Sequence, residues 1–199
     1  MITKGKKYII GVDEVGRGPL AGPVAVSAVL LPVDFKIEKN NNTPLRDSKK
    51  HTELQREYWF NFIKESPEIV FSYSYVSPKV IDRINISKAT NRAATLSVQK
   101  IIKKTGISPN NCYTLLDGGI SLGRNSNVEF ESIIKGDEKI QSIKLASIVA
   151  KVKRDRTMVR YHKLFSNYNF KKHKGYGTRE HMENIEKYGP CPIHRLTFI

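Results

Sequence analysis

The most informative segment of this chain is Ile9-Ile10-Gly11-Val12-Asp13-Glu14-Val15-Gly16-Arg17-Gly18-Pro19. Its apolar run is typical of a buried strand, and two adjacent carboxylates follow that run. Ionised carboxylates are costly at the end of a buried strand unless a partner such as a divalent metal ion compensates them. The two glycines let backbone approach a ligand, and the arginine between them suits a phosphate. The stretch therefore predicts a metal site beside a phosphate-bearing substrate.

The charge of the chain favours a polyanionic partner. There are 34 Lys and Arg residues against 19 Asp and Glu, a net charge of +15 over 199 residues. Nucleic acid is the first candidate and an anionic membrane surface the second. A generally basic proteome is the alternative, because the basic residues are spread along the chain. The 39% hydrophobic content is enough for a core, in one domain or one domain with a small appendage.

Cysteine usage and the start of the chain indicate a cytoplasmic protein. Cys112 and Cys191 are the only cysteines, and neither lies in a CxxC pair of the kind that binds zinc. So sparse a pair is typical of reduced thiols. The apolar run before Asp13 is too short for a secretion signal, and no run approaches membrane-spanning length. We expect no contact with a membrane.

Apolar and alternating patterns predict an α/β fold, a mixed sheet flanked by helices. Strands are expected at 7–14, 24–31, 69–77, 113–118 and 128–134, the first two as an antiparallel pair joined by a short glycine-rich link. Helices are expected at 52–64, capped by Thr52, at 87–104, ended by Gly106, and at 141–165 and 178–187. In the first helix the apolar residues fall near one face, namely Leu54, Tyr58, Trp59 and Phe62. The polar segment 36–48, with Asn40-Asn41-Asn42, is expected to be an exposed loop.

Three aspartates share a place at or just past the end of an expected strand: Asp13, Asp117 and Asp137. Parallel strands would bring these ends together at one edge of the sheet. Three or four carboxylates there can neutralise two divalent ions about 4 Å apart, as in phosphodiester cleavage. Oxygen ligands favour Mg²⁺ or Mn²⁺ over zinc. The alternative is that each aspartate simply ends its strand in a turn.

Two further acidic residues are expected to play lesser parts. Glu14 neighbours Asp13 on a strand, where side chains alternate between faces. We therefore expect Asp13 to be the central, bridging ligand, and Glu14 to act on one metal only or through its backbone. Asp155 lies between Arg154 and Arg156 on the expected long helix. A surface ion pair or a buried structural charge is its simpler interpretation, and a role behind the metal ligands is the alternative.

Seven motifs, in order and over nearly the whole chain, resemble those of bacterial type 2 ribonucleases H, the ribonuclease HII family. They are residues 11–23, Asp47-Ser48-Lys49-Lys50, Leu116-Asp117-Gly118, Lys135-Gly136-Asp137, residues 146–155, Lys174-Gly175-Tyr176-Gly177-Thr178, and Gly189-Pro190 with His194-Arg195-Leu196-Thr197-Phe198. Thr197 stands where the family usually has serine, which keeps the hydroxyl. The chain has no long N-terminal extension of the type 3 kind, which is expected to exclude that subtype.

The resemblance implies a ribonuclease H-like catalytic domain over 1–165 and a small C-terminal helical part over 166–199 that completes the substrate site. It implies a monomeric, metal-dependent endonuclease that cuts the RNA strand of RNA–DNA hybrids. It also implies incision 5′ to single ribonucleotides embedded in duplex DNA, in ribonucleotide excision repair. The products carry 3′-hydroxyl and 5′-phosphate ends.

The resemblance also assigns residues to roles. The acidic set of the family matches Asp13, Glu14, Asp117 and Asp137. The loop that reads the ribose 2′-hydroxyl and its phosphate matches Gly16, Arg17 and Gly18, and Tyr176 matches the tyrosine that packs on the next sugar. Ser48 and Lys49 are assigned to substrate binding, with a turn residue and a solvated lysine as the alternatives.

The chemistry of the substrate agrees with these assignments. The 2′-hydroxyl separates RNA from DNA locally, and a tyrosine ring against a deoxyribose would be crowded by an added hydroxyl. Without the resemblance, Tyr176 is equally well a loop aromatic packed on the core. Two rival functions are a basic nucleic-acid-binding module with a degenerate site, and a resolvase or integrase nuclease acting on DNA alone. His173, His181 and His194 are interpreted as packing or solvated histidines.

Overall fold

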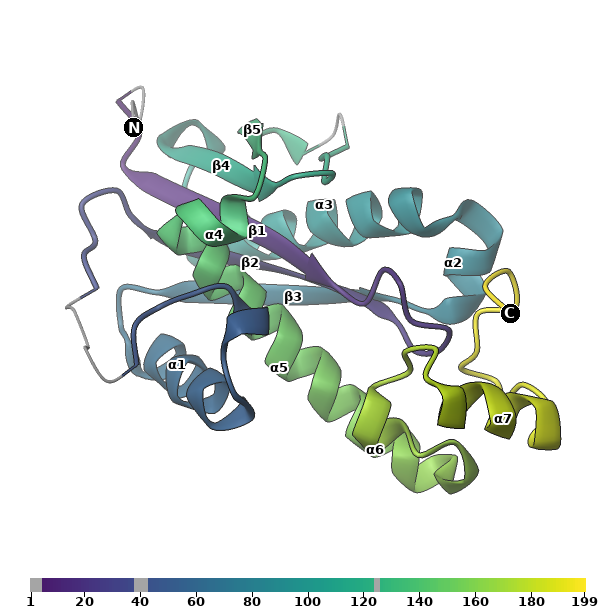
Figure 1. The fold of residues 1–199 in the computed structure, drawn as a ribbon. Helices are drawn as coiled ribbons and strands as arrows, with labels where there is room; N and C mark the ends of the chain where they lie inside the picture. The colour runs from purple at the N-terminus through teal and green to yellow at the C-terminus, as the bar shows by residue number, and fades with distance from the viewer. Residues whose placement is uncertain (1–4, 38–42, 124–125) are drawn as a thin grey trace.

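A mixed five-stranded sheet forms the centre of the molecule in the computed structural model, which describes residues 5–37, 43–123 and 126–199 (Figure 1). Its strand order is β3-β2-β1-β4-β5. The strands are β1 (Tyr8–Val15), β2 (Val24–Pro32), β3 (Val70–Val76), β4 (Cys112–Asp117) and β5 (Glu129–Ile133). β2 pairs antiparallel with β1 and β3, whereas β4 runs parallel to both β1 and β5. The predicted mixed sheet and its antiparallel first pair are confirmed.

Helices cover both faces of this sheet (Figure 1). They are α1 (Glu53–Glu65), α2 (Pro78–Ile84), α3 (Ile86–Thr105), α4 (Gly136–Lys139), α5 (Gln141–Leu164), α6 (Phe170–His173) and α7 (Arg179–Tyr188). α2 and α3 pack with one face of β1 and β2 in the larger apolar cluster. α1 and α5 pack on the other face. No helix of the described chain is both long and apolar enough to cross a membrane.

The backbones of β1 and α5 approach each other closely at Gly11. A Cβ added at Gly11 would lie 2.2 Å from the backbone carbon of Ser142, so only glycine fits there. Gly11 is two residues before Asp13, and α5 starts just beyond the segment that carries Asp137. The glycine therefore lets the long helix lie directly against the strand that ends in the carboxylates.

The helix ends were predicted correctly from the sequence, whereas the buried face of α1 was not. Thr52 forms the predicted cap of α1, with a reciprocal bond to Gln55, and Gly106 ends α3 with φ of 68°. The predicted apolar face of α1 is wrong, because Leu54 is 84% exposed and Tyr58 is 45% exposed. The face that packs against α5 and the sheet consists instead of Trp59, Phe60 and Ile63, with Phe62 at its margin.

Short elements account for the remaining differences. α2, α4 and α6 were not expected, and Asp137 lies in the first turn of α4 rather than directly at a strand end. Most of the edge strand β5 is exposed. The expected loop around Asn40-Asn41-Asn42 lies partly outside the described residues.

The C-terminal residues build a small apolar cluster of their own beside the last turns of α5. Tyr168, Phe170 and Ile193 pack there with Met158 of α5 and with Ala21 from the link between β1 and β2. α5 itself ends at Leu164. A division of the chain at 165/166 stays a prediction, but the cluster ties the C-terminal residues to the Gly-Arg-Gly link.

Candidate active site

Three carboxylates meet where β1 and β4 end. Ligand oxygens of Asp13, Glu14 and Asp117 all lie within 4.8 Å of one another. The parallel register pairs Val12 with Leu116, so Asp13 and Asp117 are the next residues along neighbouring strands. The strand ends therefore meet at one edge as expected from the sequence, and the carboxylate of Glu14 lies with those of Asp13 and Asp117.

Asp13 and Glu14 lie where burial disfavours the charged form of a carboxyl group. Asp13 is only 4% exposed. Burial first, and then the charges of Glu14 and Asp117, raise its pKa well above the usual value. Burial also raises the pKa of Glu14, against the lowering effect of Arg17. Buried acids with raised pKa values are typical of functional sites.

A hydrogen-bond chain holds Asp13 from behind. The backbone N–H of Glu14 donates to Oδ1 of Asp13 at 2.7 Å, and Ser147 of α5 also bonds to this carboxylate. The hydroxyls of Ser147 and Ser48 lie 2.7 Å apart. Because Ser147 donates to Asp13, Ser48 donates to Ser147. Ser48, predicted to bind substrate, is 3% exposed and lies behind the carboxylate.

Asp137 lies next to the group of three rather than inside it. Oδ1 of Asp117 accepts from the N–H groups of Gly136 and Asp137 at 2.7 and 3.3 Å, which holds the start of α4 against β4. A Cβ at Gly136 would lie 3.3 Å from that same oxygen and 2.5 Å from Ile143. Burial, Asp117 and Asp47 raise the pKa of Asp137, and Lys49 opposes them.

Lys49 reaches the site from a short 3-10 helix, Ser48–Lys50. Its ammonium lies 3.4 Å from Oδ2 of Asp137, while its side chain is 76% exposed. Burial lowers the pKa of this amine, but Asp47, Asp137 and Asp13 together raise it. A charged, accessible lysine beside the carboxylates is suitably placed for an incoming phosphate.

The Gly-Arg-Gly link is held by two buried arginines that sequence reasoning did not select. Arg195 donates to the carbonyls of Gly16, Arg17 and Gly22 at 2.5, 2.7 and 3.0 Å. Arg154 of α5 donates to the carbonyls of Ala21, Pro23 and Lys174 at 3.2, 3.0 and 3.0 Å. Both are 0% exposed. One signal was available: a tight link rich in glycine and proline leaves carbonyls that need donors.

Gly16 is one position where glycine is required. Its φ is +88°, and a Cβ there would lie 2.1 Å from Nε of Arg154. With the carbonyls of residues 16 and 17 turned toward Arg195, the side chain of Arg17 stays 35% exposed. Its Nη1 lies 3.9 Å from Oε1 of Glu14. The link therefore joins the acidic cluster to an accessible cation.

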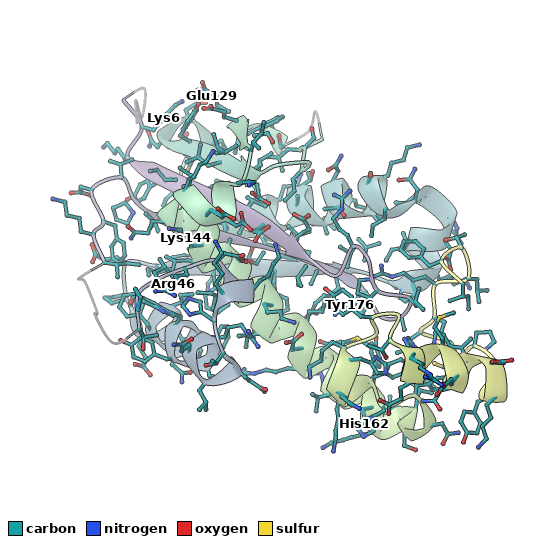
Figure 2. The ribbon with its side chains drawn as sticks, viewed as in Figure 1. Lys6, Arg46, Glu129, Lys144, His162 and Tyr176 are labelled. Atoms are coloured by element: carbon teal, nitrogen blue, oxygen red, sulfur yellow. The ribbon has the colours of Figure 1, made fainter. Side chains whose placement is uncertain are left out.

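Tyr176 lies beside the same link (Figure 2). The N–H groups of Leu20 and Ala21 donate to the carbonyl of Gly175 at 2.9 and 3.3 Å. The ring of Tyr176 is 41% exposed and lies 5.9 Å from the guanidinium of Arg154. The structure thus brings the predicted tyrosine and the predicted Gly-Arg-Gly loop together through shared contacts.

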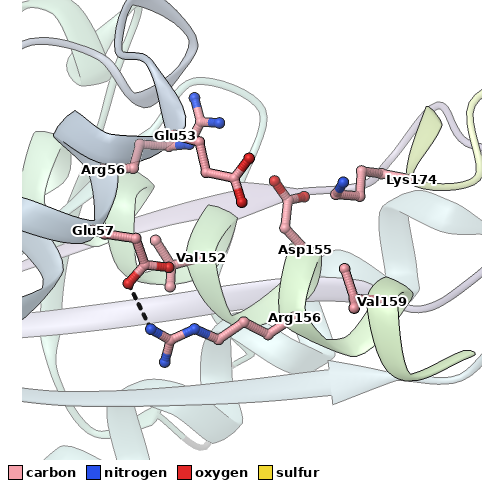
Figure 3. A pocket seen from close by; sticks show the side chains of 8 residues that line it. All are labelled: Glu53, Arg56, Glu57, Val152, Asp155, Arg156, Val159 and Lys174. Atoms are coloured by element: carbon pink, nitrogen blue, oxygen red, sulfur yellow. Dashed lines mark hydrogen bonds and ion pairs between the residues drawn. The ribbon is translucent and has the colours of Figure 1, made fainter. Parts of the chain in front are cut away.

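Asp155 lies in a different environment. It forms an ion pair with Lys151 at 2.9 Å, one turn back along α5. Figure 3 shows its carboxylate pointing into a pocket between α1 and α5, where it faces Glu53. Lys174, Val152 and Val159 also line this pocket. The ion pair matches the simpler interpretation, and its role behind the metal ligands stays a prediction.

The acidic cluster fits a divalent cation. All its donor atoms are carboxylate oxygens, the hard ligands that Mg²⁺ and Mn²⁺ prefer. Oε2 of Glu14 is buried and has no hydrogen-bond partner among the described residues. A buried oxygen of this kind is costly unless a proton or cation occupies the space it faces.

Comparisons with known proteins agree on one family. Residues 10–199 match the family model described as Ribonuclease HII. Curated proteins named Ribonuclease HII are similar to the chain in sequence. The one from Caldicellulosiruptor bescii is 46% identical over 202 residues, covering 100% of this chain and 90% of the relative. The one from Acetivibrio thermocellus is 47% identical over 195 residues, covering 98% and 71%.

Solved structures share the fold at lower identity. The structure of the PCNA:RNase HII complex from Archaeoglobus fulgidus gives a TM-score of 0.73 at 21% identity, covering 96% of this chain and 95% of the other. Bst-RNase HIII in complex with Mn²⁺ gives 0.63 at 19% identity, covering 98% and 68%. These likenesses show the arrangement of the sheet and its helices.

Proposed function

The chain belongs to the ribonuclease HII family and is therefore an endoribonuclease, and we propose that it incises duplex DNA 5′ to single embedded ribonucleotides as well as cutting the RNA strand of RNA–DNA hybrids. The observation that carries the proposal is the juxtaposition of the buried acidic cluster with the braced Gly-Arg-Gly link and Tyr176. The products would be 3′-hydroxyl and 5′-phosphate ends.

The acidic residues would hold the metal. We assign Asp13, at the centre, with Glu14 and Asp117 as ligands, joined by Asp137 from the start of α4. When bound, two divalent ions, Mg²⁺ or Mn²⁺, supply the positive charge that activates the attacking water and stabilises the leaving oxygen. The contacts to Ser147 and to the N–H of Glu14 hold the Asp13 carboxylate in one orientation before any cation binds. Asp155, which forms an ion pair with Lys151, would act from behind these ligands as the family resemblance implies.

The link residues would read the ribonucleotide. Backbone groups of Gly16 and Gly18 can approach a 2′-hydroxyl closely, and Arg17 would pair with the adjoining phosphate. Tyr176 would pack on the next sugar and favour a deoxyribose there. Lys49, accessible and 3.4 Å from Asp137, would bind the phosphate of the substrate, with Ser48 fixing its short helix.

The proposed substrate also indicates the partner, the compartment and the pathway of the enzyme. A net charge of +15 favours binding to duplex nucleic acid in general, and the reading residues supply the selectivity. We place the enzyme in the cytoplasm, as a monomer, in the repair of misincorporated ribonucleotides. Two unpaired cysteines, Cys112 and Cys191, are consistent with that compartment.

The test is a set of three matched duplexes: all-DNA, one embedded ribonucleotide, and an RNA–DNA hybrid, each with Mg²⁺ or Mn²⁺. We expect a single cut 5′ to the ribonucleotide, cleavage of the hybrid, and an intact all-DNA duplex. Equal cutting of the all-DNA duplex would favour the resolvase-type function. Binding without any cutting would favour the nucleic-acid-binding module.

A further inference from the structure

Three histidines of the C-terminal part are buried together, and the proposed chemistry uses none of them. His173, His181 and His194 are 8%, 0% and 3% exposed. The rings of His173 and His181 stack with centroids 4.4 Å apart. The Nε2 atoms of His181 and His194 lie 3.0 Å apart, within hydrogen-bond distance. Two imidazoles in such contact must share one proton, so their tautomers depend on each other.

The surrounding backbone assigns that proton. The N–H of Cys191 donates to Nδ1 of His194 at 2.8 Å, closer than the Cys191 carbonyl at 3.3 Å. His194 therefore carries its hydrogen on Nε2 and donates to Nε2 of His181. His181 then carries its hydrogen on Nδ1, which donates to the carbonyl of Tyr176 at 2.9 Å. The chain of bonds runs without conflict from Cys191 to Tyr176.

A second histidine holds the same peptide segment. The N–H of Gly175 donates to Nδ1 of His173 at 3.2 Å, and Nε2 of His173 donates to the carbonyl of Tyr168 at 2.6 Å. The N–H of Tyr176 donates to the carbonyl of His173 at 3.0 Å. The backbone of Tyr176 is thus fixed on both sides while its ring stays 41% exposed.

We propose that His181, with its tautomer fixed by His194, is a positioning residue for Tyr176 and so sets the preference for a ribonucleotide followed by a deoxyribonucleotide. The inference rests on the proposed role of Tyr176 at the sugar. His181 is fully buried and would touch no substrate; it acts through the carbonyl of Tyr176. Small displacements of a positioning group can lower rates by about a hundredfold, so one bond of this kind has a measurable effect.

The arrangement requires neutral imidazoles, because one nitrogen of each ring accepts a hydrogen bond and so carries no hydrogen. Burial lowers the pKa of His181 to about 4, and burial also lowers the pKa of His173 and of His194. Glu180 faces His173 and favours its protonation, whereas Lys172 and Lys174 oppose it. The rings are otherwise enclosed by Tyr168, Phe170 and the Cys191 segment. At neutral pH the positioning bond is therefore intact.

Two amide substitutions, each of which retains one of the two hydrogen-bonding positions of His181, distinguish the effects of its two hydrogen bonds. His181→Asn retains a donor at the position of Nδ1 and so keeps the bond to Tyr176. His181→Gln places its amide near the position of Nε2 and keeps only the contact with His194. The readout is kcat/KM on the single-ribonucleotide duplex divided by kcat/KM on the hybrid. We expect His181→Gln to lower this ratio about tenfold or more, and His181→Asn to stay within about twofold of the wild type.

Tyr176→Ala in the same assay distinguishes the inference from the function beneath it. An unchanged ratio for Tyr176→Ala would overturn the role of Tyr176, and with it the inference. A changed ratio for Tyr176→Ala with a wild-type ratio for His181→Gln would overturn the inference alone, as would equal losses in His181→Gln and His181→Asn. Long-range ¹⁵N–¹H NMR of the histidines in the wild type gives a test that needs no variant to fold. We expect Nδ1–H at His181 and Nε2–H at His194, and the opposite tautomers would overturn the proposal.

Discussion

At the residue scale, Asp13 is the most deeply buried carboxylate of the cluster, only 4% exposed. We expect Asp13→Asn to reduce cleavage by several orders of magnitude, because the isosteric amide keeps the bond from the Glu14 N–H but loses the charge a cation needs. Duplex affinity without metal should stay near the wild type, given the net charge of +15. Single-turnover cleavage and a filter-binding titration measure the two effects.

The matched control for that substitution is Asp34→Asn, an exposed aspartate in the turn after β2. Because Pro32 of β2 pairs with Tyr8 at the start of β1, this turn lies at the opposite end of the sheet from the cluster. Asp34→Asn should cleave at the wild-type rate. Normal cleavage by Asp13→Asn in Mg²⁺ would contradict the assignment of Asp13 as the central ligand.

Asp13→Asn should also increase the stability of the fold in the absence of metal. Burial raises the pKa of Asp13 in the folded chain above its pKa in the unfolded chain. As pH rises, the carboxyl group therefore ionises in the unfolded chain at lower pH than in the folded chain. The free energy of unfolding falls as pH rises above the pKa of the unfolded chain. At pH 7 that cost is present in the wild type and absent in Asp13→Asn. In EDTA we expect the variant to melt at least about 2 °C higher, the shift for about 1 kcal/mol in a chain of this size.

Calorimetry with and without Mn²⁺ completes this test. A cation that binds only the folded cluster raises the wild-type Tm by mass action, and the gain should shrink in Asp13→Asn. A variant that melts below the wild type in EDTA would show that the carboxylate stabilises the fold, contrary to the strain inferred from its burial.

At the element scale, the link between β1 and β2 contains Gly16-Arg17-Gly18. Arg195 donates to three carbonyls of this link, those of Gly16, Arg17 and Gly22. Arg195→Lys keeps the charge but cannot reach three acceptors in one plane. Because unpaired buried carbonyls cost about 1–3 kcal/mol, we expect the free energy of unfolding to fall by that amount in urea titrations. Cleavage at single ribonucleotides should fall more than cleavage of the hybrid. Arg179→Lys, whose side chain is 93% exposed, is the control and should change neither.

Periodicity and caps were enough to predict the long elements, and the reason is physical. A strand such as Val24–Pro32 or a helix with a Thr52 cap carries its signal in its own residues. α4 has four residues, too few for a periodic pattern, and its position depends on the side chain of Asp117. The face of α1 is likewise set by its packing against α5, which no local pattern contains.

Part of the candidate site could likewise be predicted from the sequence, and part depends on the tertiary fold. The proximity of Asp13 and Asp117 follows from two parallel strands with matching ends, so strand order alone predicts it. The partners of the site do not follow from local sequence. Ser147, Arg154 and Arg195 lie 134, 133 and 178 residues from Asp13, Ala21 and Arg17, the groups they hold, and only the tertiary fold brings them there.

At the scale of the whole molecule, acidification has opposite effects on stability at the buried histidine cluster and at the acidic cluster. Burial lowers the pKa of His181 to about 4, from 6.5. The folded chain then binds fewer protons than the unfolded chain, so this contribution to stability is full above pH 6.5 and is lost as pH falls toward 4. The pKa values of Asp13, Glu14 and Asp137 are raised, so acidification relieves their strain in the fold.

The balance between these groups predicts the shape of the stability curve between pH 6.5 and 4. In Asp13→Asn part of the acidic contribution is gone, so its Tm should fall more steeply on acidification than that of the wild type. In His181→Asn one titrating imidazole is gone, so its Tm should fall less steeply over the same interval. Differential scanning fluorimetry in EDTA across this range measures all three slopes. Parallel curves for the three proteins would mean that neither cluster governs the acid response, and that other titrating groups at the surface do.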